Sequence, residues 1–383
     1  MLIKKVHFAS MFALFLSLVF SVGCGSGDKP QSSGSDKTIP SAAVAKATAT
    51  PAGPAVSPPP SAGSADPAAS APELKEGEIW ENGKKYYVLN APNSLDPTSP
   101  ENLVVASHLG YFDEQGIKIN FVGAVPSGQQ IPSVLTGILH MGGGHVNTAI
   151  SAIAAGAKIK AVVQRTESSQ KIPHMVAVVK IDSDIKTAKD LGGKKLGTPG
   201  AQGCNGYFHL AFLRKHGIPD PKNYTEMVVI KEALLEQALR QGDIDAALFH
   251  RTPSYFDNNK EFRVFFSDYD IWENRGGGTP YYMSTDFIAK RPDVVRGFAT
   301  AMAKTNNWAN ERPFETRKIT ADRAKTDVNK VMERYFSPDG IIKPESVTVW
   351  IDILQEFKEI SGDIPLDKIF TNELNPFYRE TQL

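Results

Sequence analysis

Short runs of β-branched and aromatic residues alternate with stretches of helical periodicity along most of the chain. Eight such runs predict strands, because each is short, apolar and bounded by turn residues. Between them, apolar side chains recur at helical spacing, as at Leu103, Leu109 and Phe112. Strand, helix and strand in this order predict an α/β architecture with largely parallel sheets. The predicted strands are residues 85–90, 117–123, 158–164, 174–180, 194–199, 225–230, 244–249 and 262–267.

The pattern changes after Lys290, where helical periodicity continues without strand-like runs. Val294 and Phe298 indicate one helix, and Val347 and Leu354 indicate another, because each pair lies on one helical face. The C-terminal part is therefore predicted to form a helical covering over the α/β units.

The first 24 residues have the pattern of an export signal. Lys4 and Lys5 precede an apolar run at residues 8–20 that is too short to cross a bilayer as a helix. The run leads into Ser-Val-Gly-Cys at residues 21–24, which resembles a bacterial lipoprotein cleavage box with serine in place of the usual leucine. We expect residues 1–23 to be a lipoprotein signal peptide and Cys24 to be lipidated. A plain secretory signal with an incidental cysteine is the alternative.

Composition separates a tether from the folded part. Residues 25–72 are dominated by Ser, Ala, Pro, Gly and Thr and contain no aromatic residue, so they cannot bury enough apolar surface to fold. We expect residues 24–74 to be a disordered tether. The remaining ~310 residues are enough for one large domain or two medium ones.

Charge and cysteine content exclude some classes of function. Lys plus Arg equals Asp plus Glu, at 42 each, so the charge balance gives no sign of a nucleic-acid partner. The chain has two cysteines, Cys24 and Cys204. If Cys24 carries lipid, the domain has no internal disulfide and depends on packing alone.

An internal repeat supplies the first candidate site residues. Residues 137–145, GILHMGGGH, align without a gap with residues 242–250, GDIDAALFH. Each copy follows an amphipathic helix, begins with a glycine typical of a helix C-cap and runs through a short strand to His145 or His250. Ligands of open α/β sheets bind where strands end and helices begin. Chance similarity over nine residues is the alternative.

Glycine-rich turns accompany the repeat. We interpret the glycines at 142–144 as a backbone that lies against a bound molecule, with positive φ at Gly143 or Gly144 where the turn needs it. The turns at 125–130 and 198–205 each lead from a strand towards a helix, and Ser127 with Gln130 has capping-box spacing. Ordinary turn punctuation is the alternative for both turns.

Four longer segments carry a family resemblance. They are HLGYFDEQGIKINFV (108–122), SGQQIPSVLTGILHMGGG (127–144), IKTAKDLGGKKLGTPGAQG (185–203) and LRQGDIDAALFHRTPSYF (239–256). Together they resemble the substrate-binding proteins of nitrate, sulfonate and taurine ABC importers, whose fold is shared with thiamine-precursor-binding proteins. The resemblance covers roughly residues 84–310, and DLGGKKLGTPG is its most specific part. His140 stands where the family usually has aspartate, which implies a local change in packing.

The resemblance implies a type II periplasmic-binding-protein fold, with two α/β lobes that close on a ligand about a hinge. Lobe I would comprise residues 75–174 and 277–383, and lobe II residues 175–276, with the glycines at 276–278 supplying hinge freedom. The implied role is that of an extracytoplasmic, monomeric lipoprotein, anchored to the cell membrane, that captures a small organic or inorganic anion. It would deliver this anion to an ABC permease, without enzyme activity, cofactor or metal.

The implied ligand site lies at strand ends and helix starts of both lobes. Arg251 is its clearest anion ligand, because a guanidinium can give two hydrogen bonds to a carboxylate or sulfonate. The candidate ligand-binding residues are Ser127, Gln129, Gln130, Gly143, Gly144, His145, Asn147, Gln164, Gln202, Asn205, His250 and Arg251.

Other functions stay open from the sequence. Cys204 at a predicted helix start, with His145 or His250 as its base, has the outline of a nucleophilic enzyme. The fold is shared with a thiamine-pyrimidine-precursor synthase, but the cysteine cluster of that enzyme is absent. A metal shared by His145 and His250 would have too few protein ligands for a prediction. A ligand-sensing domain read by a membrane kinase would use the same closed shape.

Overall fold

The computed structural model describes residues 73–93, 97–201, 203–257 and 259–379, which belong to the compact unit Ser70–Leu383. The predicted signal peptide, Cys24, nearly all of the predicted tether and Gln202 lie outside the described residues. No helix in the described part of the chain is long and apolar enough to cross a membrane.

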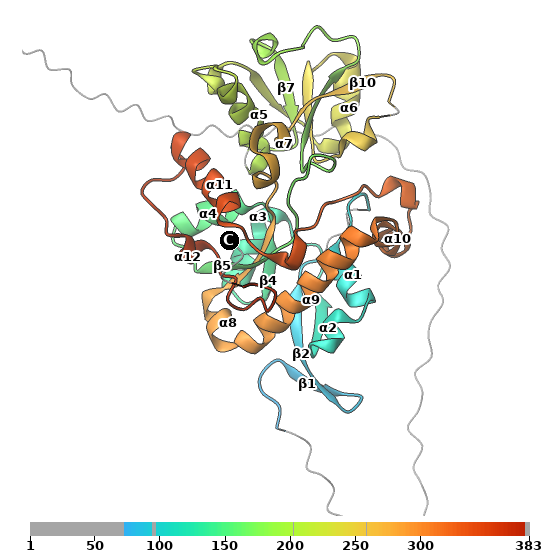
Figure 1. The fold of residues 1–383 in the computed structure, drawn as a ribbon, viewed down its shortest axis with the longest axis vertical. Coiled ribbons are helices and arrows are strands. Elements are labelled where there is room, and N and C mark those ends of the chain that lie inside the picture. Colours follow the sequence, from blue (N-terminus) through green and yellow to red (C-terminus); the bar gives the residue numbers. More distant parts are fainter. Residues whose placement is uncertain (1–72, 94–96, 202, 258, 380–383) are drawn as a thin grey trace, which may run out of the picture. The chain divides into compact units, whose positions relative to one another are not determined.

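A five-stranded mixed sheet is built from the middle of the chain (Figure 1). Its strands are β6 (Val176–Lys180), β7 (Lys195–Thr198), β8 (Glu226–Val229), β9 (Ala246–Phe249) and β10 (Phe262–Ser267). The strand order is β10-β6-β9-β7-β8, in which β7, β8 and β9 are parallel and the pairs β10–β6 and β6–β9 are antiparallel. β6 and β9 are buried on both faces, which explains their continuous apolar sequences.

Two three-stranded sheets contain the earlier strands and one later strand (Figure 1). Their strands are β1 (Glu78–Glu81), β2 (Lys84–Ala91), β3 (Ile117–Phe121), β4 (Met141–Gly143), β5 (Ile159–Gln164) and β11 (Pro280–Ser284). β2 and β3 are parallel, but β11 lies between β4 and β5 and is antiparallel to both. The expectation of largely parallel sheets is therefore wrong here, because a strand returning from the middle of the chain enters between two earlier ones.

All eight predicted strands are present, with ends that differ by at most two residues. Three described strands are not among these eight: β4, which was expected only as part of the repeat, β11 and β1. The sequence of β1, EIWE, is polar and mostly exposed.

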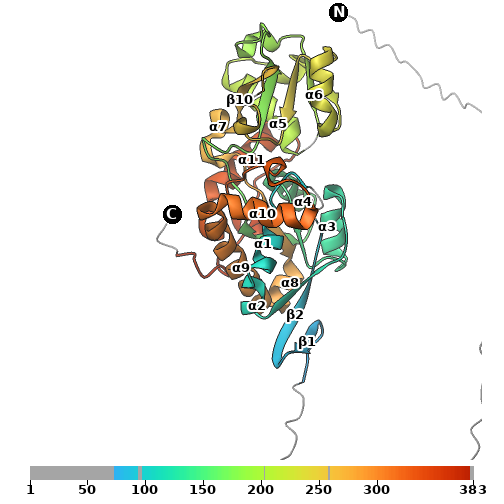
Figure 2. The ribbon, with the colours of Figure 1, turned by 90° about the vertical axis from the view of Figure 1, so that its right-hand side faces the viewer.

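Helices pack on these sheets, and further helices follow the last strand, β11, in the chain (Figure 2). Beyond β11 the described chain forms helices, short turns and isolated bridges, as the periodicity predicts. Val294, Val295, Phe298 and Met302 of the longest helix, α9, are buried against strand residues such as Leu89. The helices are α1 (Asn102–His108), α2 (Tyr111–Glu114), α3 (Ser127–Leu135), α4 (Val146–Ala154), α5 (Cys204–Lys215), α6 (Glu232–Gln241), α7 (Asp268–Trp272), α8 (Thr285–Lys290), α9 (Pro292–Glu311), α10 (Pro313–Ala324), α11 (Pro344–Glu356) and α12 (Leu366–Ile369).

The start of α3 differs from its prediction. Pro126 is the N-cap residue and no side chain caps the helix, so the predicted capping box of Ser127 and Gln130 is wrong. Pro132 lies inside the helix, where it lacks the N–H that would bond to the carbonyl of Gly128.

Two segments, residues 165–175 and 268–279, connect the five-stranded sheet to the rest of the fold. Asp268 joins them, because it accepts hydrogen bonds from Ser168 Oγ and, at 3.2 Å, from the N–H of Met175. Burial outweighs these bonds and raises the pKa of Asp268 to about 6.

The glycines at 276–278 lie in the second of these segments. None of them has a positive φ, and a Cβ at each would come within 2.7 Å of a neighbouring atom. Close packing therefore explains this run better than the predicted hinge freedom does.

Candidate functional site

A cavity of about 780 Å³ lies where several helices begin. Its wall includes Ser127 at the start of α3, the N-cap residue His145 of α4, Cys204 at the start of α5 and Glu232 at the start of α6. None of these four helices has an N-cap side chain bonded to its first turn. Their N–H groups and positive dipole ends make the wall attractive to an anion.

The repeat places its two histidines on this wall. Gly137 and Gly242 follow α3 and α6 with φ of +78° and +83°, so each turns the chain out of its helix. β4 and β9 then lead to His145 and His250. The predicted site residues on the wall are Ser127, Gly143, Gly144, His145, Asn205, His250 and Arg251.

The other predicted residues lie elsewhere. Gln129 is exposed, whereas Gln130 lines an adjoining cavity of about 440 Å³ and accepts a hydrogen bond from the N–H of Gly143 at 2.9 Å. Asn147 is buried and its Oδ1 lies 3.0 Å from Nδ1 of His145, so it positions that ring. Gln164 is buried at the end of β5, and its Oε1 has no hydrogen-bond partner among the described residues. Gln202 lies outside the described residues.

Several wall residues were not among the predicted ligand residues. Arg165 directly follows β5, so the strand-end argument that selected Gln164 could have found it. Glu232 opens α6, and its position at a helix start was a similar signal. His174 was expected to be the first residue of the predicted strand 174–180, but it lies in the connection before β6. Arg334 lies in an irregular segment, where local periodicity gives no signal.

Positive charge predominates on the described wall, which carries Arg165, Arg251 and Arg334 against the carboxylate of Glu232. Arg251 donates to Thr98 Oγ1 at 3.0 Å, and its Nε lies 3.9 Å from Glu232. Arg334 donates to the backbone carbonyl of His250 at 2.9 Å. These contacts hold the guanidinium groups at the cavity, where they can meet an anionic ligand.

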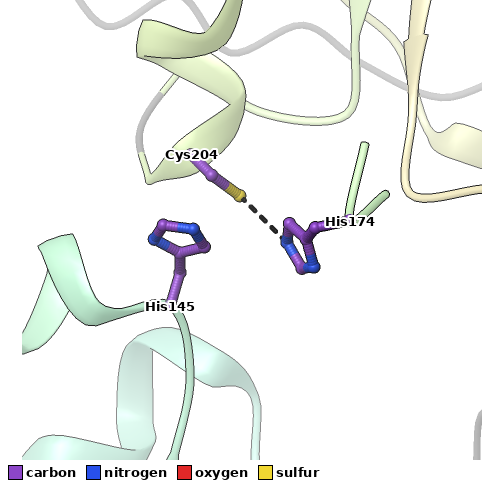
Figure 3. Close-up of side chains that lie close together, drawn as sticks. All are labelled: His145, His174 and Cys204. Atoms are coloured by element: carbon purple, nitrogen blue, oxygen red, sulfur yellow. Dashed lines mark hydrogen bonds between the residues drawn. The ribbon is translucent and has the colours of Figure 1, made fainter. Parts of the chain in front are cut away.

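A thiol and three imidazoles form a cluster on the same wall. Sγ of Cys204 lies 3.3 Å from Nε2 of His250 and 3.7 Å from Nε2 of His174. Nδ1 of His250 lies 3.2 Å from a carboxylate oxygen of Glu232. The rings of His145 and His174 have centroids 5.3 Å apart, and both lie close to Cys204 (Figure 3).

The protonation states differ within the cluster. Burial lowers the pKa of His145 to about 4 and the pKa of His174 well below its usual value, so both rings are neutral near pH 7. Burial also disfavours the charged form of His250, but its interactions with Cys204 and Glu232 raise its pKa to about 10. His250 is therefore an imidazolium that donates towards Cys204 and Glu232.

The glycine triplet at 142–144 serves two purposes. A Cβ at Gly142 would lie 2.6 Å from the ring of Tyr282, and one at Gly143 would lie 2.9 Å from the ring of Tyr281. A Cβ at Gly144 would meet no atom within 4 Å, and this residue lines the cavity. None of the three has a positive φ, so the predicted backbone conformation is wrong. Two glycines permit strand packing, and the third leaves space in the cavity.

Comparison with known structures identifies the fold as that of periplasmic substrate-binding proteins. The structure resembles the periplasmic aliphatic sulphonate binding protein SsuA from Escherichia coli, with a TM-score of 0.59 and 17% identity over 74% of this chain and 92% of that one. It also resembles the periplasmic nitrate-binding protein NrtA from Synechocystis PCC 6803, with a TM-score of 0.58 and 10% identity over 75% and 86% of the two chains. The desulfurization enzyme DSZB matches with a TM-score of 0.54 and 16% identity over 75% and 97%.

Sequence comparison gives the family. No curated protein matches the sequence significantly. The family model described as NMT1/THI5 like matches residues 99–316, which is more than half of the 383 residues, and the chain therefore belongs to the NMT1/THI5-like family.

Proposed function

We propose that this protein captures a small anion in the 780 Å³ cavity and delivers it to the permease of an ABC importer. The observation that carries the proposal is the meeting of three arginines and four helix starts at one wall, where Glu232 is balanced by His250 and Arg251. A sulfonate, nitrate or carboxylate could replace its hydrogen bonds to water with hydrogen bonds from the arginines and the helix N–H groups. The sulphonate and nitrate specificities of the two binding proteins support this class of ligand.

The wall draws on both proposed lobes, residues 75–174 with 277–383 and residues 175–276. Ser127 belongs to the first and Arg251 to the second, and Arg334 of the first donates to the carbonyl of His250 in the second. An anion bound by donors of both lobes would favour a closed state, which a permease recognises. A membrane kinase is the alternative reader, and stimulation of permease ATPase activity by the loaded protein would argue against it.

Removing one arginine from the wall tests the anion site. We expect nitrate or a short alkanesulfonate to raise the melting temperature of the full chain, purified in detergent, and Arg251→Gln to weaken this binding about 10-fold, since one charge-assisted donor is lost. Arg296→Gln is the control, because Arg296 is exposed on α9 away from the cavity wall. Calorimetric titration measures both variants. Absence of binding by nitrate, sulfonates and carboxylates alike would refute the proposal.

A thiol-dependent enzyme is the second candidate function. It is favoured by the contacts that run from Cys204 through His250 to Glu232. They have the form of a nucleophilic thiol, a protonated imidazole that stabilises its thiolate, and an orienting carboxylate. DSZB shows that this fold can carry an enzyme. Product formed from any bound sulfonate, ester or amide, and lost in Cys204→Ala, would favour this candidate over capture and delivery.

We infer that the protein works outside the cytoplasm as a monomer tethered to the membrane by a lipid on Cys24. The basic start, the short apolar run and the cysteine box of residues 1–24 support this inference. The wild-type protein should then fractionate with membranes, and Cys24→Ser should appear in the soluble extracytoplasmic fraction. Immunoblotting of the two fractions checks this, and the same distribution for both proteins would contradict lipidation.

A further inference from the structure

Three side chains on the cavity wall offer soft or borderline metal-binding atoms at close range. His145, His174 and Cys204 each place one ligand atom within 4.8 Å of those of the other two (Figure 3). They come from the start of α4, from the connecting segment 165–175 and from the start of α5. Binding of an anion by arginines and helix starts requires neither a thiol nor two imidazoles beside it, so the proposed function leaves this cluster unexplained.

The separations are close to those of a tetrahedral zinc site. Zn–S bonds of about 2.3 Å and Zn–N bonds of about 2.0–2.1 Å place sulfur and nitrogen roughly 3.6 Å apart. Sγ of Cys204 and Nε2 of His174 are 3.7 Å apart without a metal. Because all three ligand atoms lie within 4.8 Å of one another, His145 would need to approach by little more than about 1 Å at most, which a side-chain rotation can supply.

We propose that His145, His174 and Cys204 bind a borderline-soft divalent cation, in the first place Zn²⁺, with a fourth coordination position open to the cavity. The donor set of one sulfur and two imidazole nitrogens suits Zn²⁺, whereas Mg²⁺ and Ca²⁺ require oxygen ligands. All three residues line the cavity, so an ion held there would remain accessible to water or to an anion. Its ligands would tie together residues of both proposed lobes.

The surroundings supply the outer contacts that metal-binding histidines need. Nδ1 of His145 lies 3.0 Å from Asn147 Oδ1, and Nε2 lies 3.1 Å from the carbonyl oxygen of Gly276. With its proton on Nδ1, the ring would donate to Asn147 and use Nε2 as the metal ligand, and coordination would replace the present contact of Nε2 with the Gly276 carbonyl. His250, 3.3 Å from Sγ of Cys204 and oriented by Glu232, can stabilise a coordinated thiolate from outside the ligand set.

Titration of the metal-free full chain in detergent with Co²⁺, a spectroscopic substitute for Zn²⁺, tests the site in the absence of any anion. We expect one equivalent to bind, with a sulfur-to-cobalt charge-transfer band and the strong visible absorption of tetrahedral coordination, and Zn²⁺ to displace it. Cys204→Ser should remove the charge-transfer band. His174→Ala should weaken binding roughly 100-fold, because one of three protein ligands is lost.

His108→Ala is the matched control, because His108 is exposed at the end of α1, and it should bind Co²⁺ as the wild type does. Cys24 is present in every variant and cannot cause a difference between them. If His174→Ala does not fold, as judged by circular dichroism, His145→Asn replaces it with the same expectation. Absence of the charge-transfer band in the wild type, or its persistence in Cys204→Ser, overturns the proposal. Because no anion is present, failure of anion binding would not affect this result.

Discussion

Gly144→Val should weaken anion binding roughly 100-fold and leave the melting temperature of the unliganded protein almost unchanged. The added side chain meets no atom within 4 Å and projects into the cavity beside the start of α4, where it would obstruct the ligand and its hydrogen-bond donors. Gly144 has no positive φ, so valine causes no backbone strain of the kind reserved for glycine. Lost hydrogen bonds and steric exclusion together account for about 3 kcal/mol. Calorimetric titration and thermal melting of the full chain measure the two quantities.

Gly142→Ala provides the matched contrast two residues earlier. Its Cβ would lie 2.6 Å from the ring of Tyr282, so overpacking should cost about 1–3 kcal/mol of stability. Affinity should stay at the wild-type value, because Gly142 does not line the cavity. Opposite outcomes for the two variants would separate the roles of these glycines. A destabilised Gly144→Val with wild-type affinity would contradict the role of this residue as a cavity wall.

Local signals in the sequence were sufficient for eight of the eleven described strands and for the repeat. Strands such as β6 and β9 are continuous apolar runs because they are buried on both faces. Gly137 and Gly242 mark helix ends because their positive φ suits glycine, and a histidine follows each short strand by simple chain continuity. This continuity is why seven of the predicted site residues line the cavity, since strand ends and helix starts gather at one edge.

Contacts between segments distant in sequence could not be predicted in the same way. The position of β11 between β4 and β5 depends on a long-range return of the chain, and no residue within β11 encodes it. Arg334 donates to the carbonyl of His250, which is 84 residues away in sequence, and His174 lies next to Cys204, which is 30 residues away. The sequence does not distinguish a glycine that lines a cavity, such as Gly144, from one that packs against a tyrosine ring, such as Gly142. Only the tertiary packing separates these two cases.

Between about pH 8 and pH 4.5, the His209→Leu variant should lose roughly 3 kcal/mol less of its free energy of unfolding than the wild type does. His209 is buried on α5, its Nδ1 has no hydrogen-bond partner among the described residues, and burial lowers its pKa from 6.5 to about 3. The unfolded chain therefore takes up the proton first as the pH falls. Above pH 6.5, His209 is neutral in both the folded and the unfolded chain and does not lower the free energy of unfolding. As the pH falls from 6.5 towards 3, protonation of the unfolded chain lowers this free energy.

Urea unfolding gives the free energy of unfolding of the wild type and of His209→Leu at both pH values. The change between the two pH values is then compared between the two proteins, and the difference is the contribution of His209. His145 and His174 add to the wild-type loss in acid, whereas His250 and Asp268, whose pKa values are raised, oppose it. These four groups are the same in both proteins, so their contributions to the pH dependence cancel in the comparison. His108→Gln, at an exposed position, should retain the wild-type difference between the two pH values. An equal loss of stability in His209→Leu and the wild type would show that His209 is not a source of acid sensitivity.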